Sequence, residues 1–202
     1  MEIDKMIAAV QKALAIDVDG RAGPQTWLAI YERIVGPLSV EGEEADVSVV
    51  DSRSEATIAT LLPEIRPYAR MLVQKATAAD IRIKVISGMR SYEEQDRMYA
   101  KGRSIRDTSI VTNAKAGYSN HNFGIAFDIG VFEGNKYRGD SPKYKAVGVL
   151  GMELGLEWGG NWKSIVDQPH FQLRPAWAKG MNERSMLAEL RRRNAEGRMM
   201  YA

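Results

Sequence analysis

Short strand-like runs are scattered among longer helical segments in this chain of 202 residues, and that order limits the folds open to it. Residues 81–85 alternate apolar and charged side chains, which is the pattern of a half-buried strand. Residues 125–132 (IAFDIGVF) and 170–173 predict two further strands. Helices are expected at residues 3–15, 24–36, 64–79, 91–101 and 142–155, and near the C-terminus. Because strands and helices do not alternate regularly, we expect an α+β fold rather than a doubly wound α/β fold.

The charges of the chain are unevenly distributed and indicate separate parts. Residues 1–60 carry a net charge of −6, whereas the remainder carries +8. Residues 37–52 (PLSVEGEEADVSVVDS) are acidic and show no periodicity, which is typical of a linker. The sequence therefore predicts four parts: a helical segment at 1–36, a linker at 37–52, a main domain at 53–178 and a basic C-terminal helix or tail at 179–202.

Composition excludes several classes of chemistry. The chain has no cysteine, which rules out disulfide frameworks, thiolate nucleophiles and cysteine-ligated zinc. It has two histidines, His121 and His170, so a metal site would have to use these with Asp or Glu. No run approaches the roughly 18 apolar residues of a membrane span. The first apolar stretch has no cleavage site of a signal peptide, so we expect synthesis in the cytoplasm without one.

Both histidines lie in a setting that suits a metal ion. The stretch SNHNFGIAFD contains His121 and Asp128, and DQPH contains Asp167 and His170. A catalytic zinc site needs three protein ligands from histidine and carboxylate, and His121, Asp128 and His170 supply that set. Zinc lowers the pKa of a water that it binds toward about 7, and Asp167 is placed to take the proton. The competing interpretation makes each histidine an ordinary core or surface residue. The acidic residues and glycines beside both favour the metal site.

Three ordered blocks of sequence resemble the zinc peptidases that cut bacterial peptidoglycan. These include the D-alanyl-D-alanine carboxypeptidases and the phage L-alanyl-D-glutamate endopeptidases. The first block is SGMRS with the residues up to Arg103, the second is VTNAKAGYSNHNFGIAFDIG, and the third is LGLEWGGNWKSIVDQPHFQL, close to the form seen in phage endolysins. The resemblance covers about residues 60–175. It implies a small antiparallel sheet flanked by helices, the zinc D,D-peptidase or Hedgehog-like fold.

The resemblance also implies roles for the matched residues. His121, Asp128 and His170 would bind zinc. Asp167 would act as general base and then as acid to the leaving amine. Arg90 would hold the substrate or stabilise the oxyanion, a task that suits a guanidinium group; the alternative for Arg90 is a structural ion pair.

Three more residues of these blocks have two open interpretations each. Ser119 is expected either to contact substrate or only to cap its loop. Trp158 and Trp162 are expected to wall the cleft, with buried packing as the alternative, favoured for Trp158.

The N-terminal segment carries a second resemblance, to helical peptidoglycan-binding modules. VQKALAIDVDGRAGPQTWLAI looks like their Asp-Gly-x-x-Gly-Pro-x-Thr core. The matching residues are Asp19, Gly20, Gly23, Pro24 and Thr26. The segment is shorter than a typical module, so a helical hairpin packed on the main domain is the alternative.

The chain is therefore predicted to be a zinc-dependent peptidoglycan endopeptidase of phage or prophage endolysin type. It would hydrolyse the L-alanyl-D-glutamate bond of the stem peptide, lyse bacteria and act on the wall or periplasm after release from the cytoplasm. A D-alanyl-D-alanine carboxypeptidase is the rival enzyme. A non-catalytic peptidoglycan-binding protein is the rival from another class, and the intact Asp167 and Arg90 disfavour it.

Peptidoglycan is the expected partner, and a monomer is the expected state. Nucleic acid is not expected, because the basic residues lack aromatic interleaving. The tail at 179–202 carries 6 bases and 3 acids and is expected either to touch an anionic membrane weakly or simply to be solvated.

Overall fold

The chain divides into two compact units, Met1–Val47 and Ser48–Ala202. The computed structural model describes residues 2–16, 18–22, 26, 29–30, 33, 50–105, 109–163 and 165–201. The division falls inside the stretch 37–52 that the sequence predicts as a linker. Most of that stretch, and most of the helix predicted at 24–36, lies outside the described residues.

In the described part of the first unit, a loop is held around one glutamine. Helix α1 spans Ile3–Ala13, and Gln11 is its buried residue. Nε2 of Gln11 donates to Oδ1 of Asp19 at 2.6 Å and to Oγ1 of Thr26 at 3.0 Å. Its Oε1 accepts from the backbone N–H groups of Asp19 and Gly20 at 3.1 and 2.9 Å. Three residues of the module-like motif therefore hold a loop together around Gln11.

The second unit contains a small antiparallel sheet, as predicted. Its strands are β1 (Ile83–Ser87), β2 (Ala126–Glu133), β3 (Lys136–Tyr137), β4 (Glu157–Trp158) and β5 (His170–Gln172). They run in the order β1-β2-β5-β4, and β3 pairs with β2. Every pair is antiparallel. Two short strands were not predicted from the sequence. Glu157 and Trp158 of β4 look like the start of a glycine-rich turn, whereas Gly134-Asn135 between two short extended runs is a hairpin signal for β3.

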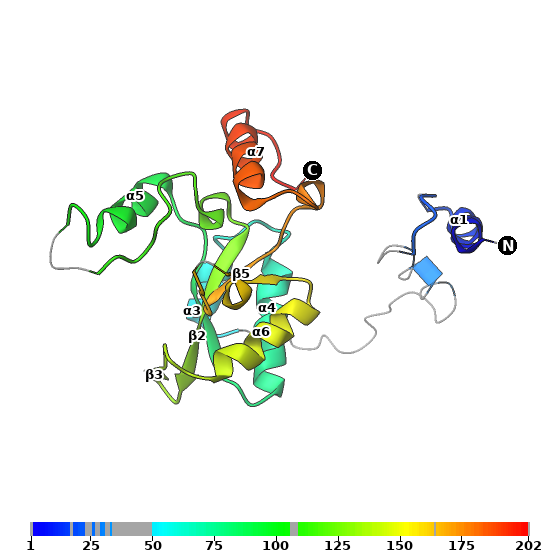
Figure 1. Ribbon diagram of the computed structural model, residues 1–202. Coiled ribbons are helices and arrows are strands. Elements are labelled where there is room, and N and C mark those ends of the chain that lie inside the picture. The colour runs from blue at the N-terminus through cyan, green and yellow to red at the C-terminus, as the bar shows by residue number, and fades with distance from the viewer. Residues whose placement is uncertain are drawn as a thin grey trace. The chain divides into compact units, whose positions relative to one another are not determined.

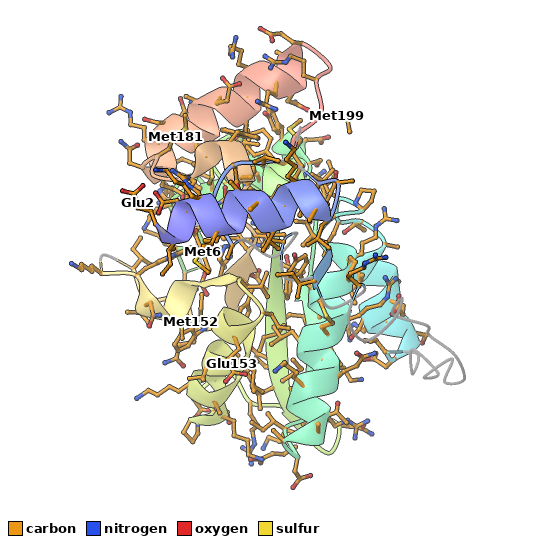
Figure 2. The ribbon with its side chains drawn as sticks, turned by 90° about the vertical axis from the view of Figure 1, so that its right-hand side faces the viewer. Glu2, Met6, Met152, Glu153, Met181 and Met199 are labelled. Atoms are coloured by element: carbon orange, nitrogen blue, oxygen red, sulfur yellow. The ribbon has the colours of Figure 1, made fainter. Side chains whose placement is uncertain are left out.

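Helices flank the sheet, which confirms the α+β class. They are α3 (Ser52–Ile58), α4 (Arg66–Ala78), α5 (Tyr92–Ala100), α6 (Lys143–Glu153) and α7 (Glu183–Ala195). Single 3₁₀ turns are η1 (Asn120–Phe123), η2 (Gly159–Asn161) and η3 (Ala176–Ala178). Helices α4 and α6 lie side by side and contact β1 and β4 respectively (Figure 1). Glu153 of α6, labelled in Figure 2, pairs with Lys75 of α4 at 3.2 Å.

The core lies between the sheet and these helices. Fully buried side chains come from both layers: Ile58, Leu72, Phe127, Ile129, Tyr144 and Phe171. Helix α3 was not predicted, and a buried hydrogen bond fixes it to the sheet. Oγ of Ser54 accepts from the backbone N–H of Val85 at 3.0 Å. The core therefore anchors β1, which leads into the first sequence block.

The C-terminal helix α7 packs on the rest of the second unit. Its apolar residues Met186, Leu187 and Leu190 are buried. Nη1 of Arg191 donates to the carbonyl of Gly117 at 2.9 Å, in the loop that leads to η1. The apolar face of this helix is thus occupied by protein, and its exposed face carries both the bases Arg184 and Arg192 and the acid Glu183. None of the helices in the described ranges is long and apolar enough to cross a membrane.

Candidate active site

A cleft of about 1390 Å³ opens in the second unit. It is lined by residues from all three sequence blocks and by the start of α7. Every residue that the sequence analysis proposed for catalysis, metal binding or substrate contact lines it: Arg90, Ser119, His121, Asp128, Trp162, Asp167 and His170. The fold therefore brings together residues that are far apart in the sequence.

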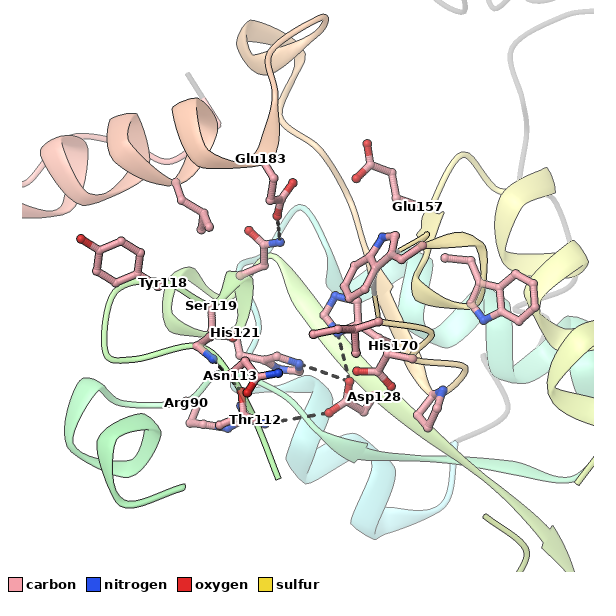
Figure 3. A pocket seen from close by; sticks show the side chains of 18 of the residues that line it. Arg90, Thr112, Asn113, Tyr118, Ser119, His121, Asp128, Glu157, His170 and Glu183 are labelled. Atoms are coloured by element: carbon pink, nitrogen blue, oxygen red, sulfur yellow. Dashed lines mark hydrogen bonds and ion pairs between the residues drawn. The ribbon is translucent and has the colours of Figure 1, made fainter. Parts of the chain in front are cut away.

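Antiparallel pairing places two of the three predicted ligands side by side, and a 3₁₀ turn supplies the third. Asp128 of β2 lies opposite His170 of β5, and η1 carries His121. Nε2 of His121 and Nδ1 of His170 each lie 3.2 Å from Oδ1 of Asp128. Figure 3 shows both rings directed at this carboxylate. One ligand atom from each residue lies within 4.8 Å of the other two.

This donor set fits a catalytic zinc ion. Two imidazole nitrogens and one carboxylate are a ligand set that zinc uses when a fourth position stays open. The two histidine side chains are almost fully buried, whereas the side chain of Asp128 is 20% exposed toward the cleft. A metal held here would be fixed by the protein on one side and open to substrate on the other.

The orientation of His121 is set by the backbone of the first block. Nδ1 of His121 lies 2.7 Å from the carbonyl oxygen of Gly88. A carbonyl only accepts, so Nδ1 carries a proton and Nε2 is the nitrogen left to bind a metal. A Cβ at position 88 would lie 2.3 Å from Oγ1 of Thr60 and 2.8 Å from the carbonyl oxygen of Thr57. Glycine therefore allows this stretch to approach α3 closely enough to reach His121.

Arg90 is buried and held at several points. Its Nη1 donates to Oε1 of Gln95 at 2.8 Å and its Nη2 donates to Oγ of Ser87 at 3.1 Å. Nη2 also lies 3.9 Å from Oδ2 of Asp128. The guanidinium group is thus fixed at the edge of the ligand cluster. Arg90 therefore has the ion-pair geometry of a structural role, and it also lines the cleft as a substrate-binding role requires.

The backbone of Gly159 holds Asp167 at the cleft. The backbone N–H of Asp167 donates to the carbonyl of Gly159 at 3.0 Å. A Cβ at Gly159 would lie 2.5 Å from the carbonyl oxygen of Asp167 and 3.0 Å from Cβ of His170. The first glycine of the Trp-Gly-Gly run therefore lets η2 pack against the segment that carries Asp167 and His170.

The pKa values of two cleft carboxylates, Asp128 and Asp167, are shifted in opposite directions. Burial alone would raise the pKa of Asp128, but the charges and hydrogen bonds of His121 and His170 outweigh it and hold that pKa well below its usual range. Burial, followed by the negative charge of Asp128, raises the pKa of Asp167. Asp128 is therefore suited to stay ionised as a ligand, while Asp167 is better able to carry a proton.

The tryptophans separate into one core residue and one cleft residue. Trp158 is buried, its ring lies against Gly148 and Gly160, and its Nε1 donates to the carbonyl of Gln168 at 2.8 Å. Packing is thus its main role. Trp162 is 37% exposed, and its ring centroid lies 4.8 Å from that of His170. Ser119 lies half-buried at the N-terminus of η1 and makes no side-chain cap hydrogen bond.

Comparison with known proteins identifies the family. A family model described as D-alanyl-D-alanine carboxypeptidase matches residues 112–173, which contain the second and third blocks. The peptidoglycan L-alanyl-D-glutamate endopeptidase CwlK of Bacillus subtilis (strain 168) is 34% identical over 127 residues, covering 57% of this chain and 74% of CwlK. The chain belongs to this peptidase family. It is thus a metallopeptidase, and zinc is the metal that suits its His-Asp-His set.

Two further proteins are also similar to this chain. The L-alanyl-D-glutamate peptidase of a Listeria phage is 29% identical over 126 residues; the match covers 60% of this chain but 41% of the phage protein. The crystal structure of Serratia marcescens L-Ala D-Glu endopeptidase ChiX is 26% identical, with a TM-score of 0.47 over 60% of this chain and 86% of that chain.

Sequence reasoning missed the residues behind the histidines. Gln172 lies 2.9 Å from His170, and Asn120 and Glu157 bond to Gln172. Residues two apart on a strand share a face, so the position of Gln172 relative to His170 was a usable signal. The partners of Gln172 come from other elements, and no spacing in the sequence indicates them.

Proposed function

We propose that this chain hydrolyses the L-alanyl-D-glutamate bond of the peptidoglycan stem peptide, with zinc held by His121, Asp128 and His170. The convergence of these three ligand atoms in an open cleft, with Asp167 beside them, carries the proposal. The choice of bond is supported by the similarity to CwlK, which is named for that activity.

Zinc bound by these ligands would supply a Lewis acid that polarises the scissile carbonyl and makes a water acidic enough to attack at neutral pH. Asp167 would be the side chain that transfers the proton. Its carboxylate takes a proton from the attacking water and returns it to the nitrogen of D-glutamate as the amide bond breaks. The raised pKa of Asp167 suits a group that must both accept and donate.

Arg90 would stabilise the negative charge that develops on the carbonyl oxygen. Its guanidinium group is already oriented by Gln95 and Ser87, so little rearrangement is needed during the reaction. Trp162 and Ser119, on the cleft walls, would contact the peptide on either side of the bond.

The experiment that tests this function is digestion of purified sacculi followed by mass spectrometry of the products. A new amino terminus on D-glutamate, together with falling turbidity, is expected. Release of free D-alanine from intact sacculi would instead establish the carboxypeptidase activity for which the matched family model is named.

The biological setting that we propose is lysis of bacteria by an endolysin of phage or prophage origin. The similarity to a Listeria phage peptidase supports it. Cleavage of the L-alanyl-D-glutamate bond frees whole stem peptides and so dissolves the wall, which gives an antimicrobial activity. Addition of the purified protein to wall-exposed cells should clear the suspension, and intact cells with zinc-loaded enzyme would contradict this setting.

We further propose that residues 1–36 bind the wall and that residues 53–178 carry the chemistry. A chain without residues 1–36 is then expected to cleave soluble muropeptides at the normal rate but to bind sacculi poorly, because a tethered second site raises the effective concentration. Equal binding of sacculi by both chains would remove the targeting role.

A further inference from the structure

The second nitrogen of His170 has a buried partner. Nε2 of His170 lies 2.9 Å from Oε1 of Gln172, and Gln172 is 1% exposed. Both residues lie on β5, two positions apart, so their side chains share one face of the strand. Gln172 therefore lies directly behind a proposed zinc ligand and on the side away from Asp128.

The amide of Gln172 can be oriented from its other neighbours. Its Nε2 donates to Oε2 of Glu157 at 2.7 Å, and a carboxylate only accepts. The oxygen of the amide is then the atom that faces His170. Nδ2 of Asn120 donates to that same oxygen at 2.5 Å, which supports the assignment independently. Because Oε1 of Gln172 accepts, Nε2 of His170 must carry the proton.

A ring of charged and polar groups holds Gln172 in place. Arg174 donates to Glu157 through Nε at 2.5 Å and through Nη2 at 3.1 Å, and Nη2 also donates to Oε2 of Glu183 at 2.9 Å. Oε1 of Glu183, at the start of α7, accepts from Nδ2 of Asn120. Oδ1 of Asn120 is buried and has no hydrogen-bond partner among the residues that the structure describes. The ring thus joins β4, β5, η1 and α7.

We propose that Gln172 is a positioning residue for zinc. It keeps His170 in the form with Nε2 protonated, so that Nδ1 is directed toward Asp128 and the metal. Glu157 keeps the oxygen of Gln172 turned to His170, and Glu183 makes the C-terminal helix part of the same support. This inference rests on the proposed function, because it assumes that the three ligands bind zinc.

The test is the zinc affinity of the full-length apo protein, measured by competition with a chromophoric chelator. Gln172→Met keeps the side-chain volume but removes the acceptor, and the Kd for zinc is expected to rise about 10–100-fold, the range for lost outer partners of a ligating histidine. Gln74→Met on α4, outside the residues that line the cleft, is the matched control and is expected to bind zinc as the wild type does.

An exchanged pair separates positioning from simple packing. Gln172→Glu alone puts a second carboxylate beside Glu157, but adding Glu157→Gln restores a donor and an acceptor between the two positions with their roles reversed. The double variant still presents an oxygen to His170 and is expected to bind zinc more tightly than Gln172→Met. A purely structural role predicts no such recovery.

A third variant, Glu157→Ala, tests the inference even if Gln172→Met does not fold. Glu157 is 37% exposed at its side chain, so Glu157→Ala removes the group that orients Gln172 with less disturbance of the core. Its zinc Kd is expected to rise about 10-fold, at the lower end of the same range. Wild-type affinity in folded Gln172→Met or in Glu157→Ala would overturn the inference. A wild-type protein that binds no zinc would instead overturn the proposed function itself.

Discussion

His121 and His170 both approach the carboxylate of Asp128, yet their outer nitrogens are held by different kinds of group. Nδ1 of His121 meets the backbone carbonyl of Gly88, whereas Nε2 of His170 meets the side chain of Gln172. No side-chain substitution can remove the first partner, because it is a backbone carbonyl. Its position does depend on glycine at residue 88, since a Cβ there would collide with Thr60. The second partner depends on several polar side chains from separate elements. One side of the site is therefore sensitive to added volume and the other to lost hydrogen bonds.

The largest expected effect is loss of a ligand on either side. His121→Ala and His170→Ala should each lose bound zinc and fall to background activity, because two remaining ligands hold the ion poorly. Metal analysis after dialysis and the sacculus assay measure this. The chain has no third histidine to compensate. Equimolar zinc with full activity in either variant would remove that residue from the site.

A smaller loss of activity is expected when the three zinc ligands are kept and the proposed general base, Asp167, is replaced. Asp167→Ala should lower turnover about 10²–10⁴-fold, the usual range for a general acid–base group. Zinc content should stay at the wild-type level, because Asp167 is not among the grouped ligands. Asp140→Ala, in the exposed turn before α6, is the control. Parallel loss of zinc and turnover would make Asp167 a support of the metal rather than a base.

The contact between His121 and the backbone carbonyl of Gly88 can be disrupted by a substitution at Gly88. Gly88→Ala forces a Cβ against Thr60 and Thr57, at an expected cost of about 1–3 kcal/mol in the free energy of unfolding. The displaced carbonyl should also weaken zinc binding, by about 10-fold or more. Chemical denaturation and chelator competition measure the two effects.

Gly134→Ala is the matched control for that experiment. Position 134 has open space around a Cβ but a φ of +58°, so the variant should lose roughly 1–2 kcal/mol from backbone strain alone. Its zinc affinity should not change. If Gly134→Ala and Gly88→Ala weakened zinc binding equally, instability rather than the Gly88 carbonyl would explain the loss.

The fold class and the main elements could be predicted from local patterns. The patterns at residues 125–132 and 170–173 predicted β2 and β5. The helix predicted at 91–101 is α5, and Ser91 caps it by accepting from the backbone N–H of Glu94 at 3.1 Å. Helix α3 was missed because its seven residues are too few to show a clear period and directly follow the acidic stretch. Short elements held by tertiary packing leave weak signals in a sequence.

The residues of the candidate site that lie in contiguous sequence blocks could be predicted. His121 and Asp128 are close in the sequence and fall in one recognisable block. The support behind them could not be predicted, because it is built across long separations. Asn120 bonds to Gln172 across 52 residues and to Glu183 across 63. Only the folded chain shows that α7, which the sequence presents as a basic tail, borders the metal site.

The most direct measurement is a long-range ¹⁵N–¹H NMR spectrum of the zinc-loaded, ¹⁵N-labelled protein. With only two histidines, it should show two imidazole rings and no others. The structure predicts that one ring is protonated at Nδ1 and binds zinc through Nε2, and that the other is protonated at Nε2 and binds through Nδ1. His121→Ala and His170→Ala assign the two patterns. Two rings with the same protonated nitrogen, or two rings unaffected by zinc, would contradict a site in which Gly88 and Gln172 orient the ligands.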